Sequence, residues 1–504
     1  MEEAHRRIKA IRQRVTHGNL EAVEREHRKG KLTARERIDK LLDRDSFIEL
    51  EPFSQPIPTG FDIDNKMLEG DGVVTGFGCI EGRQVCVWAQ DATVLGGRMG
   101  IIHARKICRI LEYALSWRVP CIGIYDSEGI EIENFLTTPS NFGYDRIAYL
   151  QTQASGVIPQ ISLIMGPCLG AAAISAQLTD FVFMVKNTSY ACVSAPKGQE
   201  QEYGDAWTLA KKTACCDVIA ENDEECISKV RELLLLLPQN NGQKPPKKET
   251  TDSAERMVDE LASLIPGEAS KAFNMYAVIS LISDNGYFFE IKRYWANNLI
   301  VGFALLDGNP LGILANNPRV MAGAMSFRAA EKMARFVQFC DAFNIPILWL
   351  ADTPAFLTTI EEEQGGIIRR GDKCVYWNSN FTVPGITIYL RKCYAGANLA
   401  MIGRNLAGDL GIALPTAEVF SVWPETGVSM IYGREIEAAP DPDAEKARRT
   451  KEFKEQMTSK PWQWMGPQDF IDPREIRVKL IKMLKTLQDK TLPPIPKKHD
   501  NITL

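Results

Sequence analysis

Two short runs of small residues are the parts of this sequence best suited to chemistry. Gly170-Ala171-Ala172 and Ala395-Gly396-Ala397 each follow an apolar segment expected to be a buried strand, and each opens a small-residue helix. The first N–H groups of a helix lack partners within it and lie at its positive end. Two such donors can form an oxyanion hole, which stabilises the charge that develops when a thioester becomes an enolate. The alternative is that small residues only let helix and sheet pack closely.

Side chains that serve other kinds of catalysis are scattered along the chain. No two of the five histidines have the spacing of one helix face: His5, His17, His27, His103 and His499. The twelve cysteines include no CxxC pair, and most lie in apolar segments where free thiols are usually buried. The sequence therefore predicts no metal site and no histidine-based triad.

A long internal repeat relates the two turns to each other. The segment from Gly76 aligns without a gap to the segment from Gly302, at a constant offset of 226 residues. Each copy reads as two strands joined by a turn, a glycine loop, an amphipathic helix and a buried strand that ends at Asp126 or Asp352. A period this long indicates a duplicated domain rather than a solenoid. We therefore expect an α/β fold built as a tandem duplication.

The boundary between the copies is expected in the polar stretch 238–253, which has the composition of a linker. This predicts an N-terminal domain over 1–250 and a C-terminal domain over 251–504. A formal charge of −5 gives no electrostatic case for binding nucleic acid or a membrane surface. Because no apolar run is long enough to span a bilayer and the N-terminus does not read as a secretory signal, a soluble cytoplasmic protein is expected.

Motifs along nearly the whole chain resemble the carboxyltransferase subunits of biotin-dependent acyl-CoA carboxylases, decarboxylases and transcarboxylase, the β subunits of propionyl-CoA carboxylases above all. The motifs that carry the resemblance are GKLTARERIDKLLDRDSFIEL (30–50), SGVIPQISLIMGPCLGAA (155–172), FVQFCDAFNIPILWLADTPAF (336–356), EQGGIIRRGDK (363–373), TVPGITIYLRKCYAGANLAM (382–401) and LPTAEV (414–419). The resemblance implies two crotonase-like ββα-repeat domains in a homo- or hetero-hexamer. It also implies active sites formed between the N-terminal half of one protomer and the C-terminal half of another.

The same resemblance implies a mechanism and its residues. Carboxybiotin releases CO2, the freed ureido nitrogen takes the α-proton of the acyl group, and the resulting enolate attacks CO2, so that no protein base is required. On the acyl-CoA side, Gly170 and Ala171 would hold the thioester oxyanion, and Gly129 would line the same site. On the biotin side, the ureido oxygen would be held by Gly396 and Ala397, with Ala395 beside them. Leu399 falls where the family tunes the size of the acyl group.

Partners follow from what the chain lacks. It has no Met-Lys-Met biotinylation site and no ATP-binding glycine loop. Biotin must therefore arrive on another polypeptide. The resemblance implies a biotin carboxyl carrier protein, together with either a biotin carboxylase or the membrane subunit of a decarboxylase. A sister carboxyltransferase subunit is a further possible partner.

The sequence departs from the family pattern mainly in its N-terminal half. The usual DSGGARIQEG is here DSEGIEIENF (126–135), which places Glu128 and Glu131 where a glycine and an arginine are usual. Residues 198–216 are several residues short, Ala171 stands for a glycine, and Ala355 stands for the glycine of Pro-Gly-Phe. A carboxylate facing the phosphates of CoA would be unfavourable within a Debye length of about 8 Å.

These departures leave several functions open. The chain could be an active carboxyltransferase for an unusual acyl group, or the α subunit of a decarboxylase of the glutaconyl-CoA or methylmalonyl-CoA type. It could instead be a paralogue that works only in a heteromeric complex and lends its biotin-facing surface. A biotin-independent hydratase or hydrolase of the crotonase type would need a carboxylate near the hole, and Glu128, Glu131 and Glu133 are the candidates. A solvated acidic loop is the interpretation we favour for these three.

Overall fold

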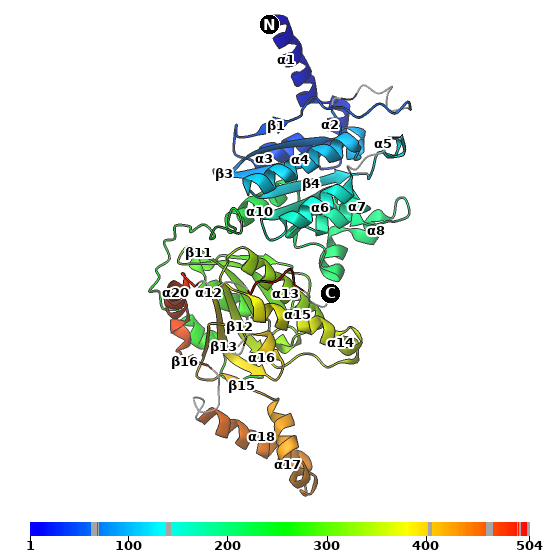
Figure 1. Ribbon diagram of the computed structural model, residues 1–504. Helices are drawn as coiled ribbons and strands as arrows, with labels where there is room; N and C mark the ends of the chain where they lie inside the picture. Colours follow the sequence, from blue (N-terminus) through cyan, green and yellow to red (C-terminus); the bar gives the residue numbers. More distant parts are fainter. Residues whose placement is uncertain are drawn as a thin grey trace. The chain divides into compact units, whose positions relative to one another are not determined.

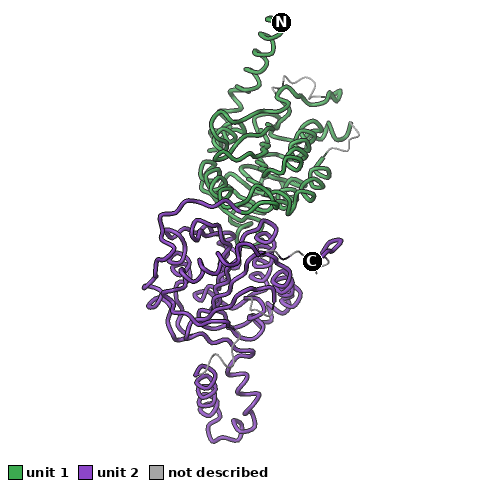
Figure 2. The backbone as a smooth tube through the Cα atoms, turned by 60° about the vertical axis from the view of Figure 1, so that its left-hand side comes forward, with its two compact units in different colours: residues 1–244 green, residues 245–504 purple. Residues whose placement is uncertain are grey.

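The computed structural model describes residues 1–61, 68, 70–137, 143–401, 406–459, 467–490, 492 and 495–500. The chain divides into two compact units, residues 1–244 and 245–504 (Figure 2). Each unit has its own mixed sheet and its own hydrophobic core. Residues 245–250, expected at the end of the first domain, belong to the second unit.

The sheet of the first unit runs in the order β1-β2-β3-β4-β5-β6-β8, with β7 paired to β5. Its first three strands are antiparallel, and from β3 onward neighbouring strands are parallel. The strands are β1 (Ile48–Leu50), β2 (Val73–Ile80), β3 (Arg83–Gln90), β4 (Cys121–Ser127), β5 (Gln160–Leu169), β6 (Phe181–Val185), β7 (Tyr190–Cys192) and β8 (Val218–Ala220).

The sheet of the second unit repeats this pattern in the order β16-β14-β13-β12-β11-β10-β9, with β15 paired to β13. The antiparallel hairpin of β10 and β11 turns at Gly308, as β2 and β3 turn at Gly82. The strands are β9 (Phe288–Ile291), β10 (Leu299–Leu306), β11 (Asn309–Asn316), β12 (Ile347–Thr353), β13 (Gly385–Tyr394), β14 (Leu410–Ala413), β15 (Glu418–Phe420) and β16 (Asp469–Phe470). The predicted tandem duplication of an α/β domain is confirmed.

Helices cover the two sheets (Figure 1). Those of the first unit are α1 (Glu2–His17), α2 (Leu20–Arg28), α3 (Ala34–Leu41), α4 (Ile101–Trp117), α5 (Ile132–Thr137), α6 (Tyr144–Ala154), α7 (Ala171–Gln177), α8 (Glu200–Gly204), α9 (Ala206–Thr208) and α10 (Asp223–Leu234). Those of the second unit are α11 (Glu260–Leu264), α12 (Met275–Ile282), α13 (Phe327–Ala342), α14 (Ile360–Gln364), α15 (Ile367–Asn380), α16 (Ala397–Ala400), α17 (Pro424–Glu437), α18 (Pro442–Ser459) and α20 (Ile476–Leu487). Helices α17 and α18 form a hairpin that projects from the second unit, and within the described ranges no helix combines the length and hydropathy needed to cross a membrane.

Local sequence explains where the site-bearing segments begin. Thr33 and Glu36 form a reciprocal capping box that starts α3 immediately after Lys31. Ser326 caps α13 by accepting a hydrogen bond from the Ala329 amide at 3.1 Å. The two caps therefore fix the residues at which α3 and α13 begin.

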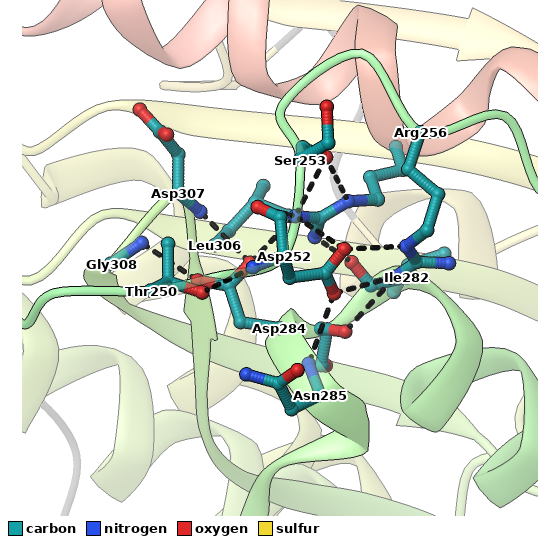
Figure 3. A network of polar contacts seen from close by, with 12 residues as sticks. Thr250, Asp252, Ser253, Arg256, Ile282, Asp284, Asn285, Leu306, Asp307 and Gly308 are labelled. Atoms are coloured by element: carbon teal, nitrogen blue, oxygen red, sulfur yellow. Dashed lines mark hydrogen bonds and ion pairs between the residues drawn. The ribbon is translucent and has the colours of Figure 1, made fainter.

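A polar network surrounds the β10–β11 turn of the second unit, and Figure 3 shows it. The fully buried guanidinium of Arg477 on α20 donates to Asp284 Oδ1 at 2.7 Å and to the carbonyl of Ile282 at 2.8 Å. Asp284 also accepts from the amides of Asp307 and Gly308, at 3.1 and 2.7 Å. This network ties the C-terminal helix to the β10–β11 turn, and its groups are all satisfied by one another, which marks it as structural.

Candidate active site

The two small-residue turns lie at the carboxyl ends of the long central strands β5 and β13. The amide of Gly170 donates to the carbonyl of Cys192 at 2.9 Å, and the amide of Ala395 donates to the carbonyl of Phe420 at the same distance. These two residues are therefore equivalent, and both have a positive φ, +63° and +51°. Glycine takes this conformation at little cost, whereas an alanine there costs roughly 1–2 kcal/mol.

Because Gly170 and Ala395 are equivalent, the amides that can donate a hydrogen bond to a ligand differ from those expected. Because the Gly170 N–H already pairs with Cys192, the expectation that Gly170 donates to a thioester oxygen does not fit the structure. The next amides along the chain are those of Ala171 and Ala172 in the first unit and of Gly396 and Ala397 in the second. Among the described residues these four have no hydrogen-bond acceptor. Ala171 thus corresponds to Gly396, and both are exposed, whereas the residues that follow them, Ala172 and Ala397, are buried.

Sequence reasoning missed a second amide beside each turn. Met99 bridges Ile130 in parallel fashion, and Met325 bridges Phe356 in the same way. In each bridge the methionine backbone forms hydrogen bonds of 2.9–3.0 Å to the residues just before and just after its bridge partner. The amide of the partner itself, Ile130 or Phe356, therefore points away from the methionine. Within the described ranges neither the Ile130 nor the Phe356 N–H has an acceptor. The sequence offers one signal for these two residues: Ile130 lies four residues after Asp126, and Phe356 lies four residues after Asp352.

In the second unit the side chain of Phe356 lies next to Gly396. A β-carbon at Gly396 would lie 3.5 Å from the ring of Phe356 and would meet no other atom within 4 Å. The turn is thus open on one side, with a flat aromatic ring on the other. An oxygen of a ligand could reach the Gly396 amide without displacing a side chain. This geometry suits an oxyanion hole built from the ends of two adjacent parallel strands, β12 and β13.

Gly129 lies in the acyl-side turn, although its amide is not free. Its N–H donates to Ser127 Oγ at 3.1 Å, and its carbonyl accepts from Met99. Its φ of +121° lies in a region that favours glycine, and a β-carbon there would meet nothing within 4 Å. Gly129 therefore shapes the turn that carries Ile130, and its contact with a ligand stays a prediction.

A buried ion network holds the end of β4 in the first unit. Asp126 accepts from Lys31 Nζ and from Arg37 Nη1, both at 2.8 Å, and Arg37 Nε reaches Asp223 at 2.7 Å. Burial alone would lower the pKa of Arg37, but the two carboxylates outweigh it and raise that pKa above its usual value. A β-carbon at Gly166 would lie 1.9 Å from Asp126 Oδ1, so only glycine fits beside this aspartate.

A large pocket opens in the first unit next to this network. It has a volume of about 950 Å³ and combines the strand ends with the segment around α2. Its charged lining residues are Arg25, Glu26, Lys29, Lys31, Arg98, Asp126 and Glu128. Arg25, Lys29 and Arg98 are the cations whose side chains remain substantially exposed there.

The acidic loop that departs from the family pattern is paired with a cation. Arg98 Nε lies 3.3 Å from Glu131 Oε2, and Arg98 Nη1 lies 3.6 Å from Glu128 Oε2. The Glu131 side chain is nearly buried, whereas that of Glu128 is exposed. Glu133 accepts a hydrogen bond from Thr59 at 3.1 Å instead. The three candidate carboxylates of a hydratase therefore do not converge on one point.

Leu399 lies exposed on α16, one turn beyond the biotin-side turn. Ile174 is exposed at the equivalent place on α7. Each apolar side chain thus stands where it could contact a ligand held by the adjacent amides, but the influence of Leu399 on acyl size stays a prediction. Across the part of the chain that the structure describes, no three His, Cys, Asp or Glu side chains are grouped in a way that could hold a metal ion.

Comparison with known proteins gives one consistent family. The model of the carboxyl transferase domain matches residues 25–502. The carboxyltransferase subunit of propionyl-CoA carboxylase from Haloferax mediterranei is 40% identical over 499 residues, which cover 97% of this chain and 96% of that protein. Subunit alpha of methylmalonyl-CoA decarboxylase from Veillonella parvula is 39% identical over 500 residues, with the same two coverages.

Solved structures agree with this result. The crystal structure of transcarboxylase 12S, a hexamer with methylmalonyl-coenzyme A bound, covers 100% of this chain and 98% of its own with a TM-score of 0.95 and 36% identity. The tandem crotonase-like fold implied by the motifs is therefore confirmed. The chain belongs to the carboxyl transferase domain family, and its predicted resemblance to the biotin-dependent acyl-CoA carboxyltransferases is confirmed.

Proposed function

We propose that this chain transfers a carboxyl group between biotin on a separate carrier protein and the α-carbon of a short acyl-CoA, with propionyl-CoA and methylmalonyl-CoA as the pair to test first. The names of the relatives at about 40% identity suggest this pair. One observation carries the proposal: free backbone amides stand at equivalent strand ends of two duplicated units. Such a duplication provides two oxyanion holes, one for the thioester oxygen of the acyl-CoA and one for the ureido oxygen of biotin.

On the acyl side, the amides of Ala171 and Ile130 would donate to the thioester oxygen as negative charge develops on it. One such donor is worth roughly 10²–10³-fold in rate. Arg25, Lys29 and Arg98, around the 950 Å³ pocket, would neutralise the phosphates of CoA. The pocket also contains Glu26 and Glu128, but Glu26 is itself paired with Lys29 and Lys31 at 2.8 and 2.7 Å.

On the biotin side, the amides of Gly396 and Phe356 would hold the ureido oxygen, with Ala397 and Ala395 completing the turn. The open space around Gly396 fits a flat bicyclic group, since a β-carbon there meets only the edge of the Phe356 ring. Biotin, when bound, supplies the carboxyl group and a nitrogen that can take the α-proton. The chain's own residues then stabilise the developing charge through their amides, orient the two partners and exclude water.

The acidic loop favours an active enzyme over a silent paralogue. Since Arg98 pairs with both Glu128 and Glu131, the loop presents less bare negative charge than its sequence suggests. The altered half also keeps its free amides and a pocket whose charged lining residues are four cations and three carboxylates. The decarboxylating direction, and a heteromeric complex with a sister carboxyltransferase subunit, remain the second candidates.

We further propose a homo- or hetero-hexamer in which the acyl side of one protomer meets the biotin side of another. Each unit exposes several large apolar side chains, and clusters of such side chains mark interaction surfaces. They are Ile130, Ile132, Leu136, Ile174 and Val193 in the first unit and Ile360, Ile368, Leu399, Met430 and Ile431 in the second. The carrier would be a biotin carboxyl carrier protein in the cytoplasm, served by a biotin carboxylase or a membrane decarboxylase subunit.

The test is transfer of labelled carboxyl from methylmalonyl-CoA to a biotinylated carrier by the purified chain. We expect transfer that avidin abolishes, because avidin sequesters biotin. CoA-ester turnover that persists with avidin would instead support a hydratase or hydrolase. A chain that binds no CoA ester alone but co-purifies with a second carboxyltransferase subunit would support the paralogue.

A further inference from the structure

The short helix that follows the biotin-side turn depends on contacts with its neighbours. Helix α16 has four residues, Ala397–Ala400, and begins directly after Gly396. A helix of this length is not stable on its own, and its last carbonyls have no acceptor role within it. The contacts that hold α16 therefore also set the direction of the Gly396 and Ala397 amides.

One buried side chain on α15 holds the end of α16. Asn378 Nδ2 donates to the carbonyl of Ala400 at 2.6 Å and to that of Leu399 at 3.3 Å. Because both partners are acceptors, the amide nitrogen of Asn378 must face α16, and the amide oxygen must face away. The backbone carbonyl of Asn378 also accepts from the Ala407 amide at 3.1 Å. Asn378 thus bonds the chain at the end of α16 and again where it returns toward β14.

Asn378 stands at a position where an apolar side chain would be expected. Ile367, Gly371, Cys374 and Asn378 follow one another along the buried face of α15, and Asn378 is 0% exposed. Burial of a side-chain amide costs free energy unless the amide is hydrogen-bonded. A leucine of similar size would bury more apolar surface here. The hydrogen bonds to α16 are therefore what Asn378 contributes at this position.

The same face of α15 lies beside the other residue proposed to donate an amide on the biotin side. A β-carbon at Gly371 would lie 3.6 Å from the ring of Phe356, and one at Gly396 would lie 3.5 Å from that ring. The ring of Phe356 thus lies against α15 as well as against the turn. Helix α15 therefore braces both residues, Phe356 through the contact at Gly371 and Gly396 through the bonds of Asn378 to α16.

The first unit uses a buried amide differently at the corresponding place. Gln151 lies on α6, the helix before β5, and its Oε1 accepts from Ser175 Oγ on α7 at 2.8 Å. Its Nε2 reaches the hydroxyl of Tyr125 at 3.4 Å. Gln151 thus bonds side chains, whereas Asn378 bonds backbone carbonyls of the segment that contains the turn. A direct hold on the backbone is therefore a feature of the biotin side.

We propose that Asn378 positions the biotin-side turn by holding the end of α16, which keeps the Gly396 and Ala397 amides aimed at one point. The effect on catalysis rests on the proposed function, whereas the hold on α16 does not. Asn378 is a positioning residue, since it is buried and acts on a ligand only through the turn. A displacement of about 1 Å at such a turn can cost up to roughly 10²-fold in rate.

The first test measures hydrogen exchange of the peptide 395–401 in the full chain, for Asn378→Leu and for Asn240→Leu. Asn240 is the matched control, because it is also buried and donates to a carbonyl at a helix end, that of Arg118 after α4, at 2.9 Å. The amides of Asn398, Leu399 and Met401 are bonded to carbonyls of the same segment. We expect Asn378→Leu alone to exchange these amides faster, by about tenfold or more.

Unchanged exchange in Asn378→Leu would overturn the proposal, whether or not the chain transfers carboxyl groups. If Asn378→Leu does not fold, Asn378→Asp takes its place in both tests. Aspartate keeps the volume of asparagine and, when ionised, has no hydrogen to donate to α16.

The second test compares carboxyl transfer by the same variants. We expect both variants to melt at a lower temperature, but only the Asn378 variant to lower kcat, by about 10-fold or more. Its KM for acyl-CoA should stay unchanged, because the pocket proposed to bind CoA lies in the first unit. Equal kcat in the Asn378 and Asn240 variants would refute the positioning role. Failure of the wild-type chain in the transfer assay would instead count against the proposed function.

Discussion

The two units end an equivalent strand with an aspartate but neutralise it from different parts of the chain. Asp126 in the first unit is paired with Lys31 and Arg37, which precede the sheet and flank the start of α3. Asp352 in the second unit is paired with the adjacent cations Arg391-Lys392 of the neighbouring strand β13, at 2.6 and 3.0 Å. The same fold therefore stabilises the same buried charge by two routes.

The difference shows that two copies of one domain can take the counter-ions of an equivalent aspartate from different segments of the chain. The second unit supplies the counter-ions from its own sheet. The first unit has Gly166 at the position of Arg391, which leaves room for a guanidinium from the N-terminal segment. Its acyl-side strand end is thus complete only when α2 and α3 are docked. The counter-ions of the biotin-side strand end lie on the adjacent strand, where Arg391 also donates to the carbonyls of Glu268 and Lys271.

We expect the largest difference in stability between the two units when one of these guanidinium groups is removed. Arg37→Leu leaves Asp126 and Asp223 buried with one partner fewer each, and breaking a buried pair typically costs about 3–5 kcal/mol. Arg391→Leu leaves Asp352 paired with Lys392, so a smaller loss of roughly 1.5–3 kcal/mol is expected. Guanidinium unfolding of both variants measures the difference, and equal losses would contradict the dependence on the N-terminal segment.

Proline in place of each small residue tests whether both turns act through backbone amides. Gly396 has a φ of −60° and Ala171 begins α7, so proline fits both positions while removing the N–H. We expect Gly396→Pro and Ala171→Pro each to lower carboxyl transfer by about 10²–10³-fold. Gly396→Ala and Ala171→Gly keep the amide and serve as controls. Proline variants as active as these controls would remove the corresponding amide from the site.

The buried histidine of the first unit should make that unit more sensitive to acid. The folded pKa of His103, about 3, lies below its unfolded value of roughly 6.5. The unfolded chain therefore binds a proton in that window and the folded chain does not, so stability is lost as the pH falls below about 6.5. One pH unit below this value the loss is about 1.4 kcal/mol. His103→Asn should flatten the pH dependence of melting between pH 6.5 and 5, and an unchanged slope would be inconsistent with a neutral buried ring.

The architecture could be predicted because the repeat is local and periodic. The matching of Gly76 to Gly302 and the polar stretch 238–253 gave two α/β units, and the small residues after each buried strand marked both turns. These features depend on residue type and spacing alone. The family motifs then added the crotonase-like fold, which the structural match confirms.

The donors themselves could not be predicted, because pairing across long distances decides which amides are free. Gly170 is occupied because β7 brings the Cys192 carbonyl to it, and nothing in the local sequence indicates this pairing. Ile130 carries no signal in its side chain, since only its backbone matters. The cations of Asp126 stand 95 and 89 residues away in sequence, beyond the range of any local pattern.

The smallest expected effect concerns the acidic loop that has no counterpart in the second unit. Glu128→Gln removes an exposed carboxylate 3.6 Å from Arg98 and leaves the closer Glu131 pair in place. Exposed pairs of this kind are worth about 0–1 kcal/mol, so the KM for acyl-CoA should fall by no more than about fivefold. Glu133→Gln, whose carboxylate bonds Thr59 instead, is the matched control and should leave KM unchanged. If KM rises in Glu128→Gln, the carboxylate assists binding of the acyl-CoA rather than opposing its phosphates, and the acyl side would differ from the biotin side in chemistry as well as in counter-ions.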